Sequence, residues 1–222
     1  MSYRENLYRN ALKIIEEIYQ QSKYDPSVDL YRSFDVMNAV NDAQLQSKEW
    51  LVHNLLPFIN KERFWPDSGG KLKDILVMGS WYGVIGMILK NHISADTKIH
   101  NVDMDPLCET FSYKLMGGEY ENIWPITDDA MEYYFERTDH FQLIINTSCE
   151  HMERHDIQLV LRQKPYNTLI CFQSNNYHAE PEHINTHDSL DSFVEELNLN
   201  AVYWKGEIKP SEDYTRYMVI GK

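Results

Sequence analysis

Residues 77–86 have the sequence VMGSWYGVIG, and this stretch decides the fold. It joins a short apolar run to an apolar helical pattern, with Gly79 and Gly83 bracketing the turn between them. Glycines in such a turn let a ligand approach the backbone N–H groups at the N-terminus of the helix. A glycine loop alone is weak evidence for a binding site, so the neighbouring segments decide its meaning.

A second apolar run at residues 99–106, IHNVDMDP, carries the acid Asp103 at its end. At this spacing after a glycine loop, a carboxylate accepts hydrogen bonds from the ribose hydroxyls of a cofactor. Together the two segments predict a site for an adenosine-containing cofactor. Asp105, directly before Pro106, has the alternative role of capping a helix. The glycine spacing in residues 77–86 does not match the G-x-G-x-x-G pattern of nicotinamide-binding domains.

Short apolar runs rich in β-branched residues recur after residue 70 and predict strands. They lie at residues 75–78, 98–102, 122–126, 141–145 and 168–172, of which 122–126 would be a short edge strand. Helical patterns lie between most of them, at residues 84–92, 106–116, 130–136 and 153–162. Strands too apolar to alternate, separated by helices, predict a doubly wound, mostly parallel sheet with helices on both faces.

The last two predicted strands differ from the others. Residues 201–204 and 214–220 are joined by a loop that contains glycine, proline and serine but no helical pattern. This connection is too short for a parallel crossover, so the last strand should run antiparallel to its neighbour. The sequence therefore predicts an α/β fold with a seven-stranded, mostly parallel sheet and an antiparallel last strand.

In the first 70 residues, the sequence patterns predict helices and no strands. Residues 1–22 carry apolar side chains at helical steps, and a second helical pattern runs over residues 36–59. Polar breaks rich in turn formers lie at residues 24–31 and 66–70. We therefore divide the chain into an N-terminal helical extension at residues 1–70 and an α/β domain at residues 71–222.

The composition favours a soluble, cytoplasmic protein with reduced thiols. Of its 222 residues, 43% are hydrophobic and 25% are charged, which is ordinary for a globular domain. The sequence has no run of about 18 apolar residues and does not begin like a signal peptide, so we expect no membrane contact. The net charge of -13 repels phosphate backbones, so nucleic acid is not the expected partner. Three cysteines without short paired spacing argue against a disulfide framework or a zinc knot.

With these segments in this order, the chain from about residue 73 to the C-terminus resembles the class I SAM-dependent methyltransferases. The resemblance implies a Rossmann-like fold, S-adenosylmethionine (SAM) as the cofactor and transfer of a group from it. It places the cofactor against the glycine loop, the acid that ends strand two and the acidic segment near the adenine. The implied cofactor contacts are Gly79, Ser80, Trp81, Gly83, Asp103, Met104, Asp128, Asp129 and Asn146.

Two positions depart from the family pattern. The acid usual just before the glycine loop is Val77 here, and the middle glycine of the loop is Trp81. The Trp81 ring would either narrow the pocket over the methionine end of the cofactor or fill the core beneath it. In related enzymes an N-terminal helix often covers the cofactor, so residues 1–70 would act as a lid. In that lid, Lys48 or Gln44 would contact the cofactor carboxylate, unless they lie on a solvated helix face.

The segment after the predicted strand four is a dense polar cluster. Residues 146–152, NTSCEHM, follow an apolar run, and the resemblance places acceptor-binding and catalytic residues in this loop. Glu150 and His151 are the catalytic candidates, because both side-chain types can be tuned to accept a proton near neutral pH. Their alternative role is to cap the next helix. The amide-rich loop at residues 173–178 would orient a polar acceptor or the cofactor carboxylate, or form a turn.

Histidines and glutamates in two segments raise the question of a metal. They are His151 and His155, four residues apart, and then His178, Glu180, Glu182, His183 and His187 in one loop. No H-E-x-x-H order occurs and the spacing in the loop is irregular, so we predict no metal site. Cys149 is not expected to be a nucleophile, because transfer from a sulfonium needs no covalent enzyme intermediate.

The predicted function is methyl transfer from SAM to a small polar acceptor molecule. Transfer of the aminocarboxypropyl arm of SAM, or another non-methyl use of the cofactor, is the alternative that Trp81 suggests. A third reading is a non-catalytic SAM-binding subunit whose pocket serves assembly or regulation. These three candidate functions share the same fold, so only the chemistry of the site can distinguish them.

Overall fold

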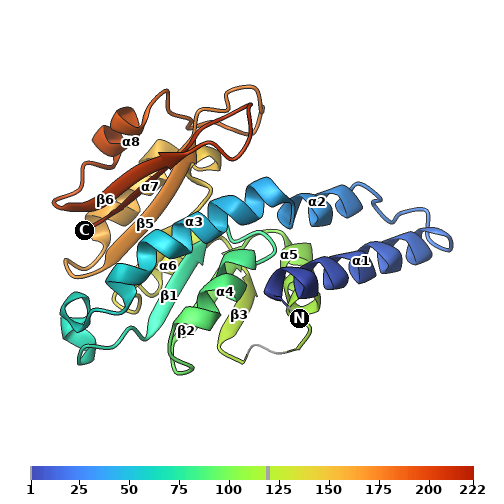
Figure 1. Ribbon diagram of the computed structural model, residues 1–222, viewed down its shortest axis with the longest axis horizontal. Coiled ribbons are helices and arrows are strands. Elements are labelled where there is room, and N and C mark those ends of the chain that lie inside the picture. Colours follow the sequence, from blue (N-terminus) through green and yellow to red (C-terminus); the bar gives the residue numbers. More distant parts are fainter. Residues whose placement is uncertain (1, 119–120) are drawn as a thin grey trace.

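The computed structural model describes residues 2–118 and 121–222 of the chain. Within these residues, seven strands form one sheet in the order β3-β2-β1-β4-β5-β7-β6 (Figure 1). The strands are β1 (Asp74–Met78), β2 (Lys98–Asp103), β3 (Ile123–Thr127), β4 (Leu143–Asn146), β5 (Leu169–Asn175), β6 (Val202–Ile208) and β7 (Arg216–Gly221). β1 to β5 pair in parallel, and β7 lies antiparallel to both β5 and β6. The prediction of a mostly parallel sheet with an antiparallel last strand is confirmed.

The strand order reverses between β1 and β4. The chain passes from β1 outward to β2 and β3, and then returns to place β4 on the other side of β1. In sheets of this kind, the loops that leave two neighbouring strands in opposite directions open a crevice beyond the carboxyl ends of the strands. The loops after β1 and β4 are therefore the first place to look for a ligand site.

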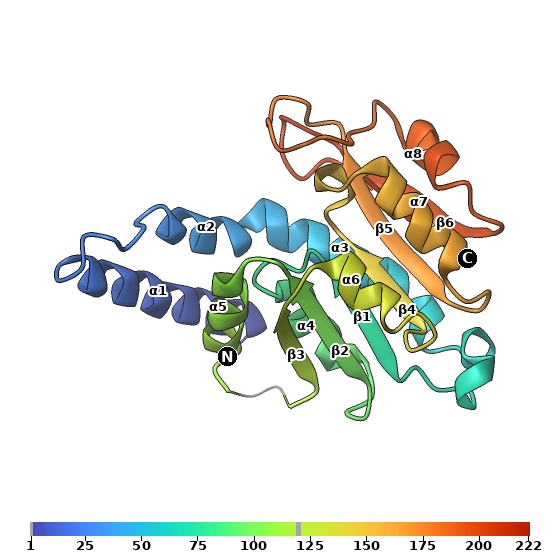
Figure 2. The same ribbon diagram turned by 180° about the vertical axis from the view of Figure 1, so that it is seen from behind.

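Alternation along the strands creates two hydrophobic layers, one on each face of the sheet. In β1, Ile75 and Val77 pack with the helices of one face, whereas Leu76 and Met78 pack with those of the other. The first face carries α1 (Tyr3–Ser22), α2 (Arg32–Ala39), α3 (Asp42–Ile59), α4 (Val84–Leu89) and α5 (Pro106–Met116), as Figure 1 shows. The second carries α6 (Ala130–Phe135), α7 (Arg154–Gln163) and α8 (Leu190–Leu197), seen in front in Figure 2. The doubly wound arrangement is confirmed.

The N-terminal helices share the hydrophobic core of the first face. α1 begins at a capping box formed by Ser2 and Glu5, and it buries an apolar stripe against the core. α1 and α2 extend beyond the β3 edge of the sheet, where α1 packs against α5 (Figures 1 and 2). Short 3-10 turns η1 (Glu62–Phe64) and η2 (Pro66–Ser68) lead into β1, and η3 (Lys90–His92) follows α4. The division into two domains at residue 70 stays a prediction. None of the described helices is long and apolar enough to cross a membrane.

Two elements differ from the sequence prediction. The single helix expected over residues 36–59 is two helices, because the Asn41 side chain accepts a hydrogen bond from Gln44 N at 2.8 Å and starts α3 afresh. α8 was not expected from the sequence. It begins at a capping box between Ser189 and Ser192 and buries Phe193 and Leu197 against the second face. The three cysteines are free, as expected for reduced thiols, and all three are buried.

Gly83 lies where α4 comes closest to β2 and α5. Its φ is +69°, and a Cβ added there would lie 2.6 Å from Asn101 Nδ2 and 2.8 Å from Ser112 Oγ. Both of these side chains are buried, so neither has free space into which to move. Glycine at this position is therefore required for the backbone turn and for the close packing of the helix against the sheet.

We expect Gly83→Ala to lower the free energy of unfolding by about 2 kcal/mol or more, since it adds a steric clash to an unfavourable φ. Gly69→Ala is the matched control, because Gly69 has the same φ of +69° but no described atom within 4 Å of an added Cβ. Urea unfolding of both variants checks this. Equal losses of stability would show that the clash at Gly83 is absent.

Candidate functional site

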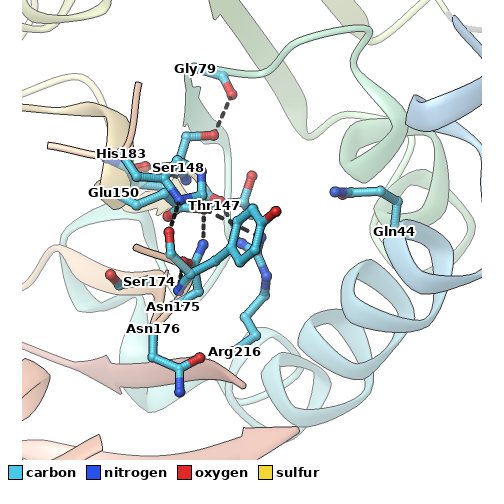
Figure 3. Close-up of polar contacts among 12 residues, drawn as sticks. Gln44, Gly79, Thr147, Ser148, Glu150, Ser174, Asn175, Asn176, His183 and Arg216 are labelled. Carbon is cyan, nitrogen blue, oxygen red and sulfur yellow. Dashed lines mark hydrogen bonds and ion pairs between the residues drawn. The ribbon is translucent and has the colours of Figure 1, made fainter. Parts of the chain in front are cut away.

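A hollow opens at the point where the strand order reverses. The loops after β1 and β4 meet there, since Ser148 Oγ donates a hydrogen bond to the Gly79 carbonyl oxygen at 3.3 Å (Figure 3). The hollow has a volume of about 950 Å³ and is walled by the ends of the central strands together with α2 and α3. Its volume and its place at the carboxyl edge are those of small-molecule and cofactor sites.

Most of the residues predicted from the sequence to form the site line this hollow. They are Lys48, Gly79, Ser80, Trp81, Asp103, Met104, Asp129, Glu150 and His151. The structure thus brings the glycine loop, the end of β2, the loop after β4 and α3 to one place.

Three predicted cofactor contacts, Gly83, Asn146 and Asp128, do not line the hollow, and their contact with a cofactor stays a prediction. Gly83 serves the packing of α4. Asn146 is 1% exposed, and its Oδ1 accepts a hydrogen bond from Ser148 N at 2.9 Å, so it orders the loop after β4. Asp128 Oδ1 accepts a hydrogen bond from Asp129 N at 2.9 Å, so that its side chain shapes the turn before α6.

The Asp103 carboxylate connects the glycine loop to the end of β2. Asp103 Oδ2 accepts a hydrogen bond from Trp81 N at 2.7 Å, and Oδ1 accepts one from Asp105 N at 3.1 Å. The two carboxylate oxygens offer about four acceptor positions, so one remains beside these two hydrogen bonds and the one with the Cys108 side chain. The carboxylate is therefore oriented by the backbone and still able to bind hydroxyl groups in the hollow.

Trp81 combines the two roles considered for it. Its φ of 50° lies in the left-handed region that favours glycine, which explains why the family pattern has glycine at this position. The ring is half-buried, stacks on Tyr82 with centroids 5.2 Å apart, and also lines the hollow. Trp81 therefore packs against the core with one part of its ring and narrows the hollow with another.

Asp105 has the capping role that its place before Pro106 suggested. Its Oδ1 accepts a hydrogen bond from Leu107 N at 2.9 Å at the start of α5. Its Oδ2 lies 2.6 Å from Arg32 Nη1, an ion pair that ties α2 to the rim of the hollow. Arg32 was missed in the sequence, because it lies outside the motifs and precedes the helix that was expected.

A buried ion pair forms the floor of the site. Glu150 is 2% exposed and Arg216 is 7% exposed, and Arg216 Nη2 lies 3.3 Å from Glu150 Oε1. Asn175 Nδ2 donates to the same carboxylate oxygen at 2.6 Å, and Arg216 Nη1 donates to the Thr147 carbonyl oxygen at 2.9 Å (Figure 3). Sequence reasoning missed Arg216, whose one signal is a lone arginine at the start of an apolar strand. Asn175, expected to orient a ligand or form a turn, forms a turn by accepting a hydrogen bond from Tyr177 N at Oδ1 at 2.8 Å, while its Nδ2 holds Glu150.

Lys48 lies on α3, lines the hollow and has a lowered pKa. It is 8% exposed and donates a hydrogen bond to Gln44 Oε1 at 2.6 Å, so the alternative of a solvated helix face is wrong for Lys48. Burial lowers the pKa of Lys48 to about 7, the charge of Arg216 lowers it as well, and Glu150 opposes both. The ammonium group is thus partly deprotonated at neutral pH, and an anion placed beside it would restore its proton.

The lining of the hollow is strongly acidic. Nine carboxyl side chains line it against three cationic ones. The acids are Asp35, Asp103, Asp105, Asp129, Glu150, Glu153, Asp156, Glu180 and Glu182, and the cations are Arg32, Lys48 and Arg216. Such a hollow attracts cationic ligands and repels polyanions, except where its few cations can pair with an anionic group.

Of the histidines and glutamates considered as metal ligands, the structure brings only some close together. One ligand atom from each of Glu150, His151 and His183 lies within 4.8 Å of the other two. The described side chains of His178 and His187 have other partners, since His178 contacts Thr186 and Asp188, and His187 contacts Ser174 and Glu196. His155 lies on α7 outside this group. Cys149 is fully buried, and burial raises the pKa of its thiol, which agrees with the expectation that it is no nucleophile.

Comparison with known proteins gives matches among solved structures. No protein-family model and no curated protein sequence matches the chain. The N-methyltransferase NodS from Bradyrhizobium japonicum WM9 aligns over 82% of this chain and 98% of its own, at 12% identity and a TM-score of 0.61. Geranyl diphosphate methyltransferase in complex with GPP and sinefungin aligns over 79% of this chain and 76% of its own, at 10% identity and a TM-score of 0.57. MtNAS in complex with MTA and tNA aligns over 98% of this chain and 70% of its own, at 14% identity and a TM-score of 0.53.

These alignments and the strand order define the class of fold. The chain has the Rossmann-like fold of the class I SAM-dependent methyltransferases, with strand order β3-β2-β1-β4-β5-β7-β6 and an antiparallel β7. A mutant of MtNAS has been solved in complex with S-adenosylmethionine, so a neighbour with this fold holds that cofactor.

The burial of Lys48 predicts a specific pH dependence of stability. The pKa of Lys48 is about 7 in the folded protein and 10.5 for the free side chain, so the unfolded state binds more protons between these values. The wild type should therefore gain stability relative to Lys48→Met as pH rises from about 7 to 10, by at most about 1.4 kcal/mol per unit. Chemical unfolding of both proteins across this range checks it. The exposed Lys13, changed to Met, is the control, and a Lys48→Met difference that is constant with pH would contradict the burial of a charged amine.

Proposed function

We propose that this protein is a SAM-dependent methyltransferase that acts on a small polar acceptor and holds SAM in the hollow. One observation carries the proposal: the Asp103 carboxylate ends β2 at the point of strand-order reversal and lines the hollow with an acceptor position left over. A carboxylate in this place binds the ribose hydroxyls of an adenosine-containing cofactor. The fold and the glycine loop agree with that assignment.

The chain's own residues fit SAM. Gly79 has a φ of +57°, which favours glycine, and its lack of a side chain leaves the backbone of the loop open to a ligand. Asp103, Met104 and Asp129 would hold the adenosine end. Lys48, whose proton an anion would restore, would pair with the carboxylate of the methionine end. The cofactor supplies a methyl carbon on a positively charged sulfur, and an acidic hollow suits that charge.

His151 would accept a proton from the attacking acceptor, and Glu150 is the second candidate. His151 is exposed and lines the hollow, so an acceptor can reach it. Glu150 is buried with one carboxylate oxygen engaged by Asn175 and Arg216. The protein's contribution is then to align the acceptor with the methyl group, to exclude water and to receive the proton.

The acidity of the hollow points to a neutral or cationic acceptor, such as an amine. NodS is an N-methyltransferase, and the acceptor atom of such an enzyme is a nitrogen. The helical extension at residues 1–70 would close over the cofactor, because α3 contributes Lys48 and α2 contributes Arg32 to the walls. This assigns the extension the role of a lid.

Transfer of the aminocarboxypropyl arm is a second candidate function. The MtNAS alignment covers 98% of this chain, so it includes most of the N-terminal helices, whereas the NodS alignment covers 82%. Loss of the arm from SAM leaves methylthioadenosine, and MtNAS has been solved in complex with MTA. Trp81, which narrows the hollow, would favour attack on a different carbon of the cofactor.

The fate of the cofactor distinguishes these functions. The protein is incubated with SAM and a panel of small amines and alcohols, and the nucleoside products are identified by mass spectrometry. We expect S-adenosylhomocysteine, and we expect His151→Ala to slow its formation by about 100-fold or more, the usual contribution of a proton acceptor. Methylthioadenosine would instead establish arm transfer. Turnover of neither kind would indicate a non-catalytic SAM-binding subunit and contradict the proposal.

A further inference from the structure

We propose that Glu150, His151 and His183 bind a divalent transition-metal ion of the zinc type in the wall of the hollow. One ligand atom of each residue lies within 4.8 Å of the other two. Donor atoms around a tetrahedral zinc ion lie about 3.3 Å apart, so small side-chain movements suffice to close this group on an ion. Figure 3 shows Glu150 and His183 side by side next to Ser148. The sequence predicted no metal site at these residues.

The fold brings these residues together from two distant segments. Glu150 and His151 belong to the 3-10 turn η4 (Cys149–His151) directly after β4, and His183 lies in the loop between β5 and α8. Backbone hydrogen bonds fix that loop in place. Asn185 N donates to the Glu150 carbonyl oxygen at 3.0 Å, and His187 N donates to the Asn175 carbonyl oxygen at 2.9 Å. The cluster is therefore part of the ordered structure and does not depend on a free loop.

One oxygen of the Glu150 carboxylate has hydrogen-bond partners, and the other has none among the described residues. Oε1 accepts hydrogen bonds from Asn175 and Arg216, which orient the carboxylate. Oε2 is buried and has no hydrogen-bond partner among the described residues, although the whole residue is 2% exposed. A buried charged oxygen without a partner is costly and needs an explanation, and a bound cation supplies one. Metal-ligating carboxylates are held by outer hydrogen bonds in this same way.

His183 has the tautomer that a metal ligand requires. Its Nδ1 lies 2.7 Å from the Tyr177 carbonyl oxygen. A carbonyl oxygen only accepts hydrogen bonds, so Nδ1 carries a proton, and in the neutral ring Nε2 keeps its lone pair. Histidine ligands of metals usually donate their second N–H to such a carbonyl or carboxylate. The His151 ring meets the His183 ring edge to face, with centroids 4.6 Å apart.

The ligand set and its surroundings select the kind of ion. Two imidazoles and one carboxylate suit zinc and similar ions better than magnesium or calcium, which prefer oxygen ligands alone. Glu180 and Glu182 line the same hollow and add negative charge nearby. Three protein ligands leave at least one coordination position for another molecule, as in catalytic zinc sites.

That open position gives the ion a role in the reaction, and this part rests on the proposed function. An acceptor nitrogen or oxygen bound to the ion would lose its proton to water, because a cation lowers the pKa of the group it binds. The acceptor atom would then bond to the methyl carbon of SAM while the carbon–sulfur bond breaks and its electron pair stays on sulfur. His151 would act as a ligand of the ion in place of a free base.

Cobalt binding tests the site directly. Protein freed of metal with a chelator is titrated with Co²⁺, whose visible absorption reports coordination by nitrogen and oxygen ligands. Four proteins are compared: wild type, His151→Gln, His183→Gln and the control His155→Gln, an exposed histidine on α7 outside the cluster. We expect wild type and His155→Gln to bind equally, and the other two variants to bind at least about tenfold more weakly. Equal affinity in all four proteins, or no cobalt band in the wild type, would overturn the proposal.

A second readout separates failure of the metal site from failure of the proposed function. Calorimetric titration of SAM into the metal-free wild type measures cofactor binding without the ion. The metal site stands if cobalt binds as expected, whether or not SAM binds. If SAM binds and cobalt does not, the metal site is refuted and the methyltransferase proposal survives.

Discussion

The buried ion pair between Glu150 and Arg216 is the interaction on which the site depends. Arg216 opens β7 and lies opposite Asn175 at the end of β5, a register that only an antiparallel strand beside β5 provides. Arg216, the first residue of β7, therefore lies at the edge of the sheet where the parallel strands end. Breaking such a buried pair by removing one partner costs about 3–5 kcal/mol, because the remaining charge is left without compensation. The pair therefore couples the topology of the sheet to the position of the loop after β4.

The charges around this pair form one connected system. Arg216 lowers the pKa of Lys48 and Glu150 raises it, so the lysine on α3 responds to the pair beneath it. Glu150 in turn has one buried oxygen without a hydrogen-bond partner among the described residues, and a ligand atom of its carboxylate lies within 4.8 Å of His151 and His183. A sulfonium cofactor, an amine acceptor and a metal ion are all positively charged species that this acidic environment would attract. The carboxylate of a cofactor would find its partner in Lys48, which lines the same hollow.

The sequence predicts the parts of the structure that local patterns encode. Apolar runs predict the strands, and the run ending in Asp103 after a glycine loop places the carboxylate at the edge of the hollow. Interactions between distant segments could not be predicted in this way. The meeting of Arg216 with Glu150 requires the register of β7, and that of His183 with His151 requires the path of a loop without regular structure. The role of Gly83 could not be chosen from the sequence, because glycine serves both close packing and ligand approach.

Binding of SAM against the Asp103 carboxylate is the central claim, and calorimetric titration tests it most directly. SAM is titrated into the wild type, Asp103→Asn and Asp96→Asn, the last an exposed aspartate in the loop before β2 that serves as the control. The wild type and Asp96→Asn should bind with equal affinity. Asp103→Asn should bind about 1–3 kcal/mol more weakly, because an amide replaces the charged acceptor of the ribose hydroxyls. Equal affinity in all three proteins, or no binding by the wild type, would contradict the claim.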